Sequence, residues 1–444
     1  MNPKFENNIG IAVPEIMMPE KSVDLTKWAC VACDQYTSQP DYWNKCEEIV
    51  GDAPSTLRLM LPEIYLEKPG EAERIAAINA AMKEYVEKGI LENKGEGFVL
   101  TRRFVDGKWR NGLVVCLDLE AYDYAKGSTT LIRATEGTIV ERIPPRLRIR
   151  EGATIELPHI IVLIDDDGKT VIEPLVQKVA NEEKLYDFEL MQGGGHVEGW
   201  LIKDEGLIRG VIDALAGLVN PTKYGTEMPP LLFAMGDGNH SFATAKANWE
   251  KLKATLPEEE RANHPARYAL VELENVHDDG IVFEPIHRVI FNVHTGAFLE
   301  ALRTELEKQN GKCEVRWFDC PHCRASAMKE LPAGAHAIPF VIDGKIGLII
   351  VEKPAAQLEV GTLQNALDVV LKRTEGAVID YIHGEDVVNE LGSKPGNIGF
   401  LLPPMAKGDL FKTVVFDGAL PRKTFSMGEA HEKRYYLECR KIGK

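Results

Sequence analysis

The feature that most constrains the fold is a strand–turn–helix sequence near the middle of the chain, at 231–253. The apolar run LLFAM is long enough for one buried strand, and the tight turn Gly236-Asp237-Gly238 follows it directly. Four apolar residues then recur at helical spacing, namely Phe242, Ala245, Trp249 and Leu252. This segment predicts a buried strand that leads straight into an amphipathic helix, an arrangement typical of proteins in which helices cover a sheet.

Strand-like and helix-like segments alternate along the rest of the chain. Helices are expected at 71–91 and 205–220, and strands are expected in GFVLTRRF, NGLVVCLDL, TLIRATEGTIV and HIIVLIDD. A second series of helices and strands starts near His294. We therefore expect an α+β (mixed α/β) protein with two domains. The larger, at 1–292, would carry the turn and the catalytic site, and the smaller α+β domain would occupy 293–444.

The charge balance limits the classes of partner. Asp and Glu number 68 against 52 Lys and Arg, so the net charge is −16. This argues against non-specific binding to nucleic acid or to anionic membranes, because both depend on Lys and Arg. No apolar run approaches the roughly 18 residues of a membrane span, and the N-terminus lacks a signal-peptide core. We expect a soluble cytoplasmic protein that acts on a small-molecule metabolite, and the sequence indicates no oligomeric state.

The residue types at the turn suit phosphate chemistry. Its two glycines permit a close approach of the backbone, and the free N–H groups of a helix start form an anion site. Asp237 is a candidate metal ligand or base, and His240 is a candidate for phosphate contact or proton transfer near neutral pH. The alternative is an ordinary capped helix, with Asn239 or Ser241 as its N-cap residue. The local pattern leaves both alternatives open.

A second candidate is the arginine-rich segment at 131–152. Arg146, Arg148 and Arg150 alternate with apolar residues, so in a strand their guanidinium groups would share one face. Arg133 and Arg142 would extend this face into a basic patch suited to phosphate or carboxylate. Glu136 lies in the same segment and is a candidate base with a depressed pKa. The alternative is a solvated edge strand that its charges protect from pairing.

Two further motifs are less specific. Cys320-Pro321-His322-Cys323 lies between an expected strand and an expected helix, as in thioredoxin-like oxidoreductases. The chain between Cys323 and Pro339 is too short for the helix, strand and helix that this fold requires. His287, in FEPIHRV, is either a structural histidine or a catalytic one. No segment matches Gly-x-Gly-x-x-Gly or the P-loop pattern, which argues against a Rossmann or Walker-type site.

Several of these segments together resemble a known family. They are WACVACDQYTSQPDYW, RATEGT with PRLRIREGATIELPHIIVLIDD, DGNHS, FEPIHRV, FLLPPM and LPRKTF. On this basis the chain is identified as a member of the "domain of unknown function 1015" family, in its Asp-Gly-Asn-His-Ser subgroup. The motif is distantly similar to Asp-Gly-His-x-Arg of the ParB/sulfiredoxin superfamily, which includes a free serine kinase. There the helix start and its Arg hold nucleotide phosphates. Here Ser241 stands at the Arg position, so Lys246 or the arginines at 146–150 would have to replace it.

The resemblance implies a ParB/sulfiredoxin-like phosphate-binding core and a phosphotransferase that acts on a small hydroxyl metabolite such as free serine. The donor would be a nucleoside triphosphate, a nucleoside diphosphate or pyrophosphate, with Mg²⁺ at Asp237. Candidate catalytic residues are Asp237, His240, Glu136 and His287. Candidate phosphate-binding residues are Gly236, Gly238, Asn239, Ser241, Lys246, Arg133, Arg142, Arg146, Arg148 and Arg150. The alternatives are a phosphoester hydrolase, a non-catalytic nucleotide-binding regulatory protein, and a thiol oxidoreductase that uses Cys320 and Cys323.

Overall fold

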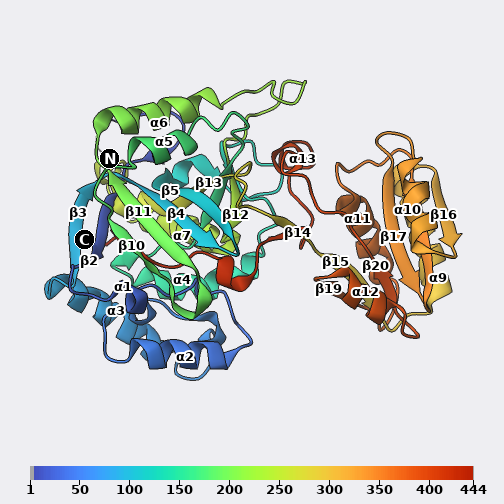
Figure 1. Ribbon diagram of the computed structural model, residues 1–444, viewed down its shortest axis with the longest axis horizontal. Helices are drawn as coiled ribbons and strands as arrows, with labels where there is room; N and C mark the ends of the chain where they lie inside the picture. The colour runs from blue at the N-terminus through green and yellow to red at the C-terminus, as the bar shows by residue number, and fades with distance from the viewer. Residues whose placement is uncertain (1–4, 444) are drawn as a thin grey trace. The chain divides into compact units, whose positions relative to one another are not determined.

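The computed structural model describes residues 5–443, which divide into two compact units (Figure 1). The first unit comprises 1–282 together with 427–444, and the second comprises 283–426. The domain boundary expected at 292/293 differs from this division in two ways: the second unit begins earlier, at Phe283, and it ends before the last residues of the chain. Strand β15 (His287–Phe291) belongs to the sheet of the second unit, and the last residues of the chain pack with the first unit. That the first unit carries the catalytic site stays a prediction.

The first unit is built on a ten-stranded mixed sheet. Nine strands follow the order β10-β11-β4-β5-β13-β9-β12-β7-β6, and β1 pairs with β5. Their bounds are β1 Ile11–Ala12, β4 Phe98–Val105, β5 Lys108–Asp118, β6 Tyr122–Asp123, β7 Ile132–Arg133, β9 Ile161–Ile164, β10 Tyr186–Glu189, β11 His196–Ile202, β12 Phe233–Asp237 and β13 Tyr268–Asn275. β12 is parallel to β7 and antiparallel to β9, so the strand of the predicted turn lies inside the sheet.

Helices cover both faces of this sheet. Leu113, Val115 and Leu117 of β5 pack into one core with α6 and α7, whereas Val114 and Cys116 face a second core that includes α1, α2 and α3. The helices are α1 Leu25–Trp28, α2 Pro40–Val50, α3 Glu71–Glu87, α4 Ile143–Glu151, α5 Glu173–Lys178, α6 Glu205–Gly217, α7 Asn239–Lys253 and α8 Glu258–Arg261. Two small sheets complete the unit, from β2 Glu15–Pro19 with β3 Leu91–Glu96 and β8 Ile155–Glu156 with β22 Arg440–Lys441.

The second unit is a six-stranded antiparallel sheet with the order β16-β18-β17-β20-β15-β19. Helices α9 and α11 pack together beside it. The remaining bounds are α9 Thr295–Asn310, β16 Cys313–Phe318, α10 Pro321–Lys329, β17 His336–Ile342, β18 Lys345–Val351, α11 Glu359–Leu371, β19 Val378–Ile382, α12 Glu385–Gly392, β20 Ile398–Phe400 and α13 Asp409–Asp417. At the ends of the unit, β14 Phe283–Pro285 pairs with β21 Phe425–Met427.

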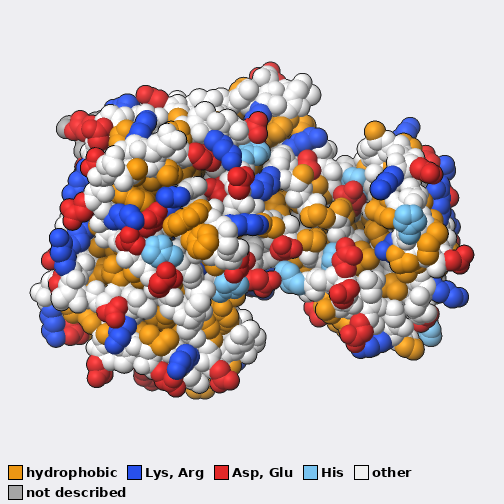
Figure 2. Space-filling view, viewed as in Figure 1, with side chains coloured by type: hydrophobic (Ala, Val, Ile, Leu, Met, Phe, Trp, Pro, Cys, Tyr) orange, Lys and Arg blue, Asp and Glu red, His pale blue; other side chains and the backbone are white. Residues whose placement is uncertain are grey.

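These elements confirm the expected mixed α/β fold. The helices predicted at 71–91 and 205–220 are present as α3 and α6. Within residues 5–443, no helix is both long enough and apolar enough to cross a bilayer. On the face shown in Figure 2, basic and acidic side chains are interspersed.

Candidate phosphate-binding site

The turn between β12 and α7 is shaped by two glycines. The β9–β12 register shifts between Met235 and Asp237, which places Gly236 at an irregularity of the strand. A Cβ on Gly236 would lie 2.9 Å from the Sδ of Met427 and 3.0 Å from the Cγ of Leu163. Gly238 has a φ of +81°, a conformation that favours glycine. The sequence therefore needs glycine at one position for space and at the other for backbone conformation.

Helix α7 starts without a side-chain cap. Its N-cap residue is Gly238, and no side chain accepts a hydrogen bond from the first turn. The expectation that Asn239 or Ser241 caps the helix is therefore wrong, because both residues already lie inside it. The N–H groups at the helix start remain available to an anion, supported by the helix dipole. Nearby, the Oδ1 of Asn239 is buried, and among the described residues it has no hydrogen-bond partner.

His240 lies in the first turn of α7 and contacts the loop that precedes α4. The Ile139 N–H donates to His240 Nε2 over 3.3 Å. Burial and the nearby guanidinium groups of Arg142 and Arg146 lower the pKa of His240 to about 4, against a smaller opposing effect of Asp34. The imidazole is therefore neutral at pH 7. Because Nε2 accepts a hydrogen bond, the ring proton lies on Nδ1, which can donate to a ligand oxygen.

Asp237 is held by the C-terminal segment of the chain. Its Oδ1 accepts the Gly238 N–H at 2.9 Å, and its Oδ2 lies 3.2 Å from the Nζ of Lys433. The Lys433 side chain is only 12 % exposed, so this ion pair is part of the turn. No local pattern in the sequence links Lys433 to the turn, and the sequence analysis missed it.

A chain of hydrogen bonds continues from Ser241. His159 Nε2 lies 2.9 Å from Ser241 Oγ, and His159 Nδ1 lies 2.8 Å from Tyr436 Oη. The Cys33 N–H donates to the same Tyr436 oxygen at 3.2 Å. The tyrosine hydroxyl can then donate to Nδ1, and the Nε2–H of His159 to Ser241.

This chain brings the N-terminal segment to the site. Asp34 follows Cys33 and lies close enough to His240 to influence its pKa. Asp34 is not among the predicted site residues, although it lies in the WACVACDQYTSQPDYW block that carries the family resemblance. His159 and Tyr436 were missed as well, because neither is near the turn in sequence.

The part of the arginine-rich segment that holds Arg146, Arg148 and Arg150 is helix α4, so the strand predicted for these three residues is wrong. Two prolines in the first turn of α4 suit a helix start, and α4 packs against α7. Each arginine forms a separate ion pair. The pairs are Arg146–Glu63 at 2.6 Å, Arg148–Glu71 at 3.0 Å and Arg150–Glu156 at 2.5 Å. Their charges are therefore largely neutralised, and they do not share the face that a strand would give them.

Arg142 differs from these three. It is the exposed N-cap residue of α4, close enough to His240 to lower its pKa. Within residues 5–443, its guanidinium group makes no ion pair or side-chain hydrogen bond. Of the predicted arginines, Arg142 best retains its charge for a ligand at the turn.

Other predicted site residues have structural partners. Arg133 donates to the carbonyl oxygens of Thr130, Pro229 and Pro230 at 2.7–2.9 Å and so fixes a loop. Lys246 pairs with Glu250 at 2.7 Å, further along α7. Glu136 is half-buried in the segment after β7, which is tied to β12 by the hydrogen bond from Thr135 Oγ1 to the Met235 carbonyl at 2.6 Å. The role of Glu136 as a base stays a prediction.

His287 belongs to the second unit. It is fully buried in β15, and its Nδ1 accepts the Leu402 N–H at 3.0 Å. Burial and the adjacent Arg288 lower the pKa of His287 to about 4. These contacts favour a structural role, although among the described residues its buried Nε2 has no hydrogen-bond partner. The catalytic role of His287 stays a prediction.

The fit of Mg²⁺ at the turn can be judged from the donor set. Mg²⁺ in phosphate sites is held by one or two carboxylates together with phosphate oxygens and water. Asp237 supplies one carboxylate, whose Oδ2 is already neutralised by Lys433. Asp237 therefore fits as a single protein ligand when phosphate oxygens supply the rest. Among residues 5–443, two other groups could hold a metal ion: Asp106, His431 and Glu432, and Asp187, His196 and Glu198.

A groove of about 880 Å³ lies elsewhere in the first unit, between α5, β11 and the start of α6. It is lined by both lysines and carboxylates, and it does not include the turn.

Three solved structures show a remote similarity to this chain. A free serine kinase variant in complex with AMP is 11 % identical over 74 % of this chain and 92 % of that chain, with a TM-score of 0.40. A conserved hypothetical protein from Pyrococcus furiosus is 12 % identical over 73 % and 90 %, with a TM-score of 0.34. SbnI with a C-terminal truncation, from Staphylococcus aureus, is 10 % identical over 74 % and 87 %, with a TM-score of 0.37.

No curated protein matches the chain. The model of one family, described as "Protein of unknown function (DUF1015)", matches residues 16–370. Because this match covers most of the sequence, the chain belongs to the DUF1015 family.

Proposed function

We propose that this protein transfers a phosphoryl group between a nucleotide or pyrophosphate and the hydroxyl of a small metabolite, such as free serine. The observation that carries the proposal is the uncapped start of α7, whose first turn includes His240. Arg142 lies near His240, and Lys433 pairs with Asp237 just before the helix. Phosphoryl transfer depends mainly on positioning and on neutralising charge at the phosphate oxygens. A helix start with neighbouring cations supplies both.

Each residue has a distinct role in this proposal. The helix N–H groups and the Nδ1–H of neutral His240 donate to the phosphate oxygens, and Arg142 offsets their charge. Mg²⁺ at Asp237 would supply further neutralisation. A carboxylate then takes the proton of the acceptor hydroxyl, and Asp34, Glu136 and Asp237 are the candidates. Asp34 is favoured by its proximity to His240.

The test is a product screen with a matched pair of variants. The full-length protein is incubated with Mg²⁺, with ATP, ADP or pyrophosphate, and with free hydroxy amino acids and their phosphoesters. Mass spectrometry then detects every new or lost phosphoester. His240→Ala should reduce turnover by about 10²-fold or more, as for loss of a key transition-state donor. The control is His294→Ala, which replaces an exposed histidine at the start of α9 in the second unit and should retain activity.

The outcomes separate the alternatives. Transfer is supported if wild type and His294→Ala, but not His240→Ala, move the phosphoryl group between the nucleotide or pyrophosphate and the hydroxy compound. Release of inorganic phosphate without an acceptor product would identify a hydrolase instead. Equal turnover in His240→Ala, or no conversion in wild type, would contradict the proposal.

A further inference from the structure

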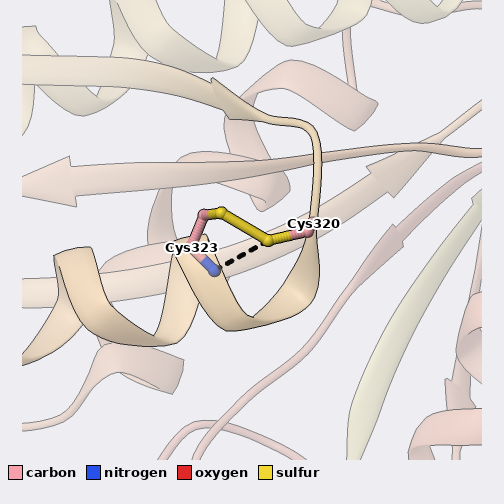
Figure 3. The surroundings of a disulfide bond; sticks show 2 residues. All are labelled: Cys320 and Cys323. Carbon is pink, nitrogen blue, oxygen red and sulfur yellow. Dashed lines mark hydrogen bonds between the residues drawn. A yellow bond between two sulfur atoms is a disulfide. The ribbon is translucent and has the colours of Figure 1, made fainter.

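One cysteine pair in the second unit is set apart from the other cysteines. Cys320 and Cys323 form a disulfide across the first turn of α10, with their Cα atoms 5.4 Å apart (Figure 3). Cys323 is exposed and Cys320 is half-buried. The other six cysteines are free thiols, five of them buried and Cys33 half-buried. The disulfide is therefore the cysteine site that solvent reaches most readily.

The local structure favours a thiolate on Cys320. Cys320 is the N-cap residue of α10, and its Sγ accepts the N–H of Cys323 at 3.1 Å, as Figure 3 shows. Pro321 follows Cys320 as the first residue of the helix, where its fixed φ suits the helix and its missing N–H would have no partner within the helix. A helix N-terminus lowers the pKa of a cysteine placed there, because N–H groups and the helix dipole stabilise the anion. Cys320 is thus the better leaving group of the two.

The disulfide contributes little to holding the fold together. It closes a loop with a sequence separation of only 3, and the entropic stabilisation by a cross-link increases with loop length. No residue of α10 is buried, so the helix end can react without opening the core of the unit. A structural disulfide would be expected to join distant segments or a buried loop, and this one does neither.

We propose that Cys320 and Cys323 form a reversible thiol–disulfide exchange site that reacts with low-molecular-mass thiols. In reduction, the thiolate of a first thiol attacks the exposed Cys323 Sγ. A new S–S bond forms there, the Cys320–Cys323 bond breaks, and the electron pair leaves on Cys320 Sγ. A second thiolate attacks the sulfur of the bound thiol and releases Cys323. Two thiols are oxidised to one disulfide, and both cysteines take up a proton. Oxidation reverses these steps.

The first test measures the redox equilibrium of the full-length protein. The folded protein is equilibrated without oxygen in mixtures of reduced and oxidised glutathione, quenched with acid, alkylated and digested with trypsin. Cleavage after Arg316 and Arg324 gives the peptide 317–324, which contains both cysteines of the pair and no other. This peptide should change from doubly alkylated to unalkylated as the proportion of oxidised glutathione rises, and the change should reverse. Cys313→Ala, which removes a buried thiol of the same unit, should leave the midpoint unchanged.

Two results would overturn the proposal. The peptide could stay doubly alkylated at every ratio, which would show that no disulfide forms. It could instead stay oxidised in reduced glutathione alone, which would show a structural bond. Both readouts are independent of any phosphoryl-transfer activity.

The second test assigns the attacked sulfur. When reduction is stopped early, fragmentation of the peptide should show glutathione on Cys323 in several-fold excess over Cys320. In Cys320→Ser, the Cys323 thiolate should attack oxidised glutathione, forming a mixed disulfide and releasing one reduced glutathione. An excess of glutathione on Cys320 would contradict the stabilised-thiolate argument.

Discussion

At the scale of single residues, the candidate site contains a histidine, His240, whose protonated form is disfavoured. His240 accepts an N–H from Ile139 and lies near Arg142 and Arg146, so its neutral form is favoured. A neutral imidazole has one nitrogen that accepts a hydrogen bond and one that donates. Because Nε2 accepts the Ile139 N–H, the donor is the Nδ1–H. The same ring, if protonated, would lose the contact with Ile139.

The first prediction concerns the pH dependence of His240. Its pKa in the folded protein is about 4, below the ordinary 6.5, so the unfolded chain binds the proton more readily. This group therefore contributes stability that is fully present above pH 6.5 and is lost as the pH falls towards 4. Nuclear magnetic resonance of the imidazole nitrogens should show the neutral Nδ1–H form throughout pH 5–8. Arg142→Ala should raise the pKa of His240, because one nearby positive charge is removed. A wild-type pKa near 6.5 would contradict the assignment.

The second prediction concerns the chain from Ser241 through His159 to Tyr436. Removing His159 takes one hydrogen-bond partner from Ser241 Oγ and one from the buried Tyr436 Oη, which keeps the Cys33 N–H. A buried group left without a partner costs about 1–3 kcal/mol. His159→Ala should therefore destabilise the protein more than Ser241→Ala, as measured by urea unfolding. In a double-mutant cycle the two changes should couple by about 0.5 kcal/mol or more. Purely additive effects would show that the hydrogen bond carries no stability.

At the scale of secondary-structure elements, the sequence was informative where the periodicity was simple. Helix α7 and strand β12 have a clear apolar pattern, and their junction predicted the turn. The period-2 alternation of Arg146 to Arg150 suggested a strand, yet the segment forms α4. The prolines start that helix, and its arginines find glutamates on three separate elements. Glu63 and Glu71 are distant in sequence, so no local pattern could reveal those two partners.

The third prediction tests the fit of the turn itself. Gly236→Ala would place a methyl group about 3 Å from the side chains of Met427 and Leu163, so overpacking should destabilise the protein by about 1–3 kcal/mol. The control is Gly210→Ala in α6, an exposed helical position whose added Cβ meets nothing within 4 Å. That change should stabilise the protein by roughly 0.5–1 kcal/mol through helix propensity. Thermal unfolding of the two variants compares them directly, and equal midpoints would contradict the close packing.

At the scale of the whole molecule, the chain returns to its first unit after building the second. Residues 427–443 supply Lys433 and Tyr436 to the site and are anchored by two buried ion-pair networks. One joins Arg434 to Glu272 and Glu438, and the other joins Arg440 to Glu156. The sequence shows no periodic signal for this return, which explains why the expected division at 292/293 kept the last residues in one C-terminal domain.

The fourth prediction follows from that return. Lys433→Ala would leave the Asp237 carboxylate without its ion pair, and its negative charge would then oppose a phosphate at the turn. The affinity for ADP, or for pyrophosphate, should fall by about tenfold, which corresponds to about 1.4 kcal/mol. Calorimetric titration measures it, with Lys441→Ala as the control because Lys441 is exposed on β22. If Lys433→Ala binds ADP and pyrophosphate as tightly as wild type, Lys433 does not contribute to ligand binding at the turn.

The late position of Lys433 and Tyr436 also bears on how the protein is made. A ribosome releases the second unit before it releases residues 427–443, because synthesis proceeds from the N-terminus. The first unit can therefore form most of its sheet early, yet its turn waits for the last part of the chain. During synthesis the second unit can therefore fold before Lys433 and Tyr436 reach the turn, and a nascent chain that stalls between these two events would lack both contacts.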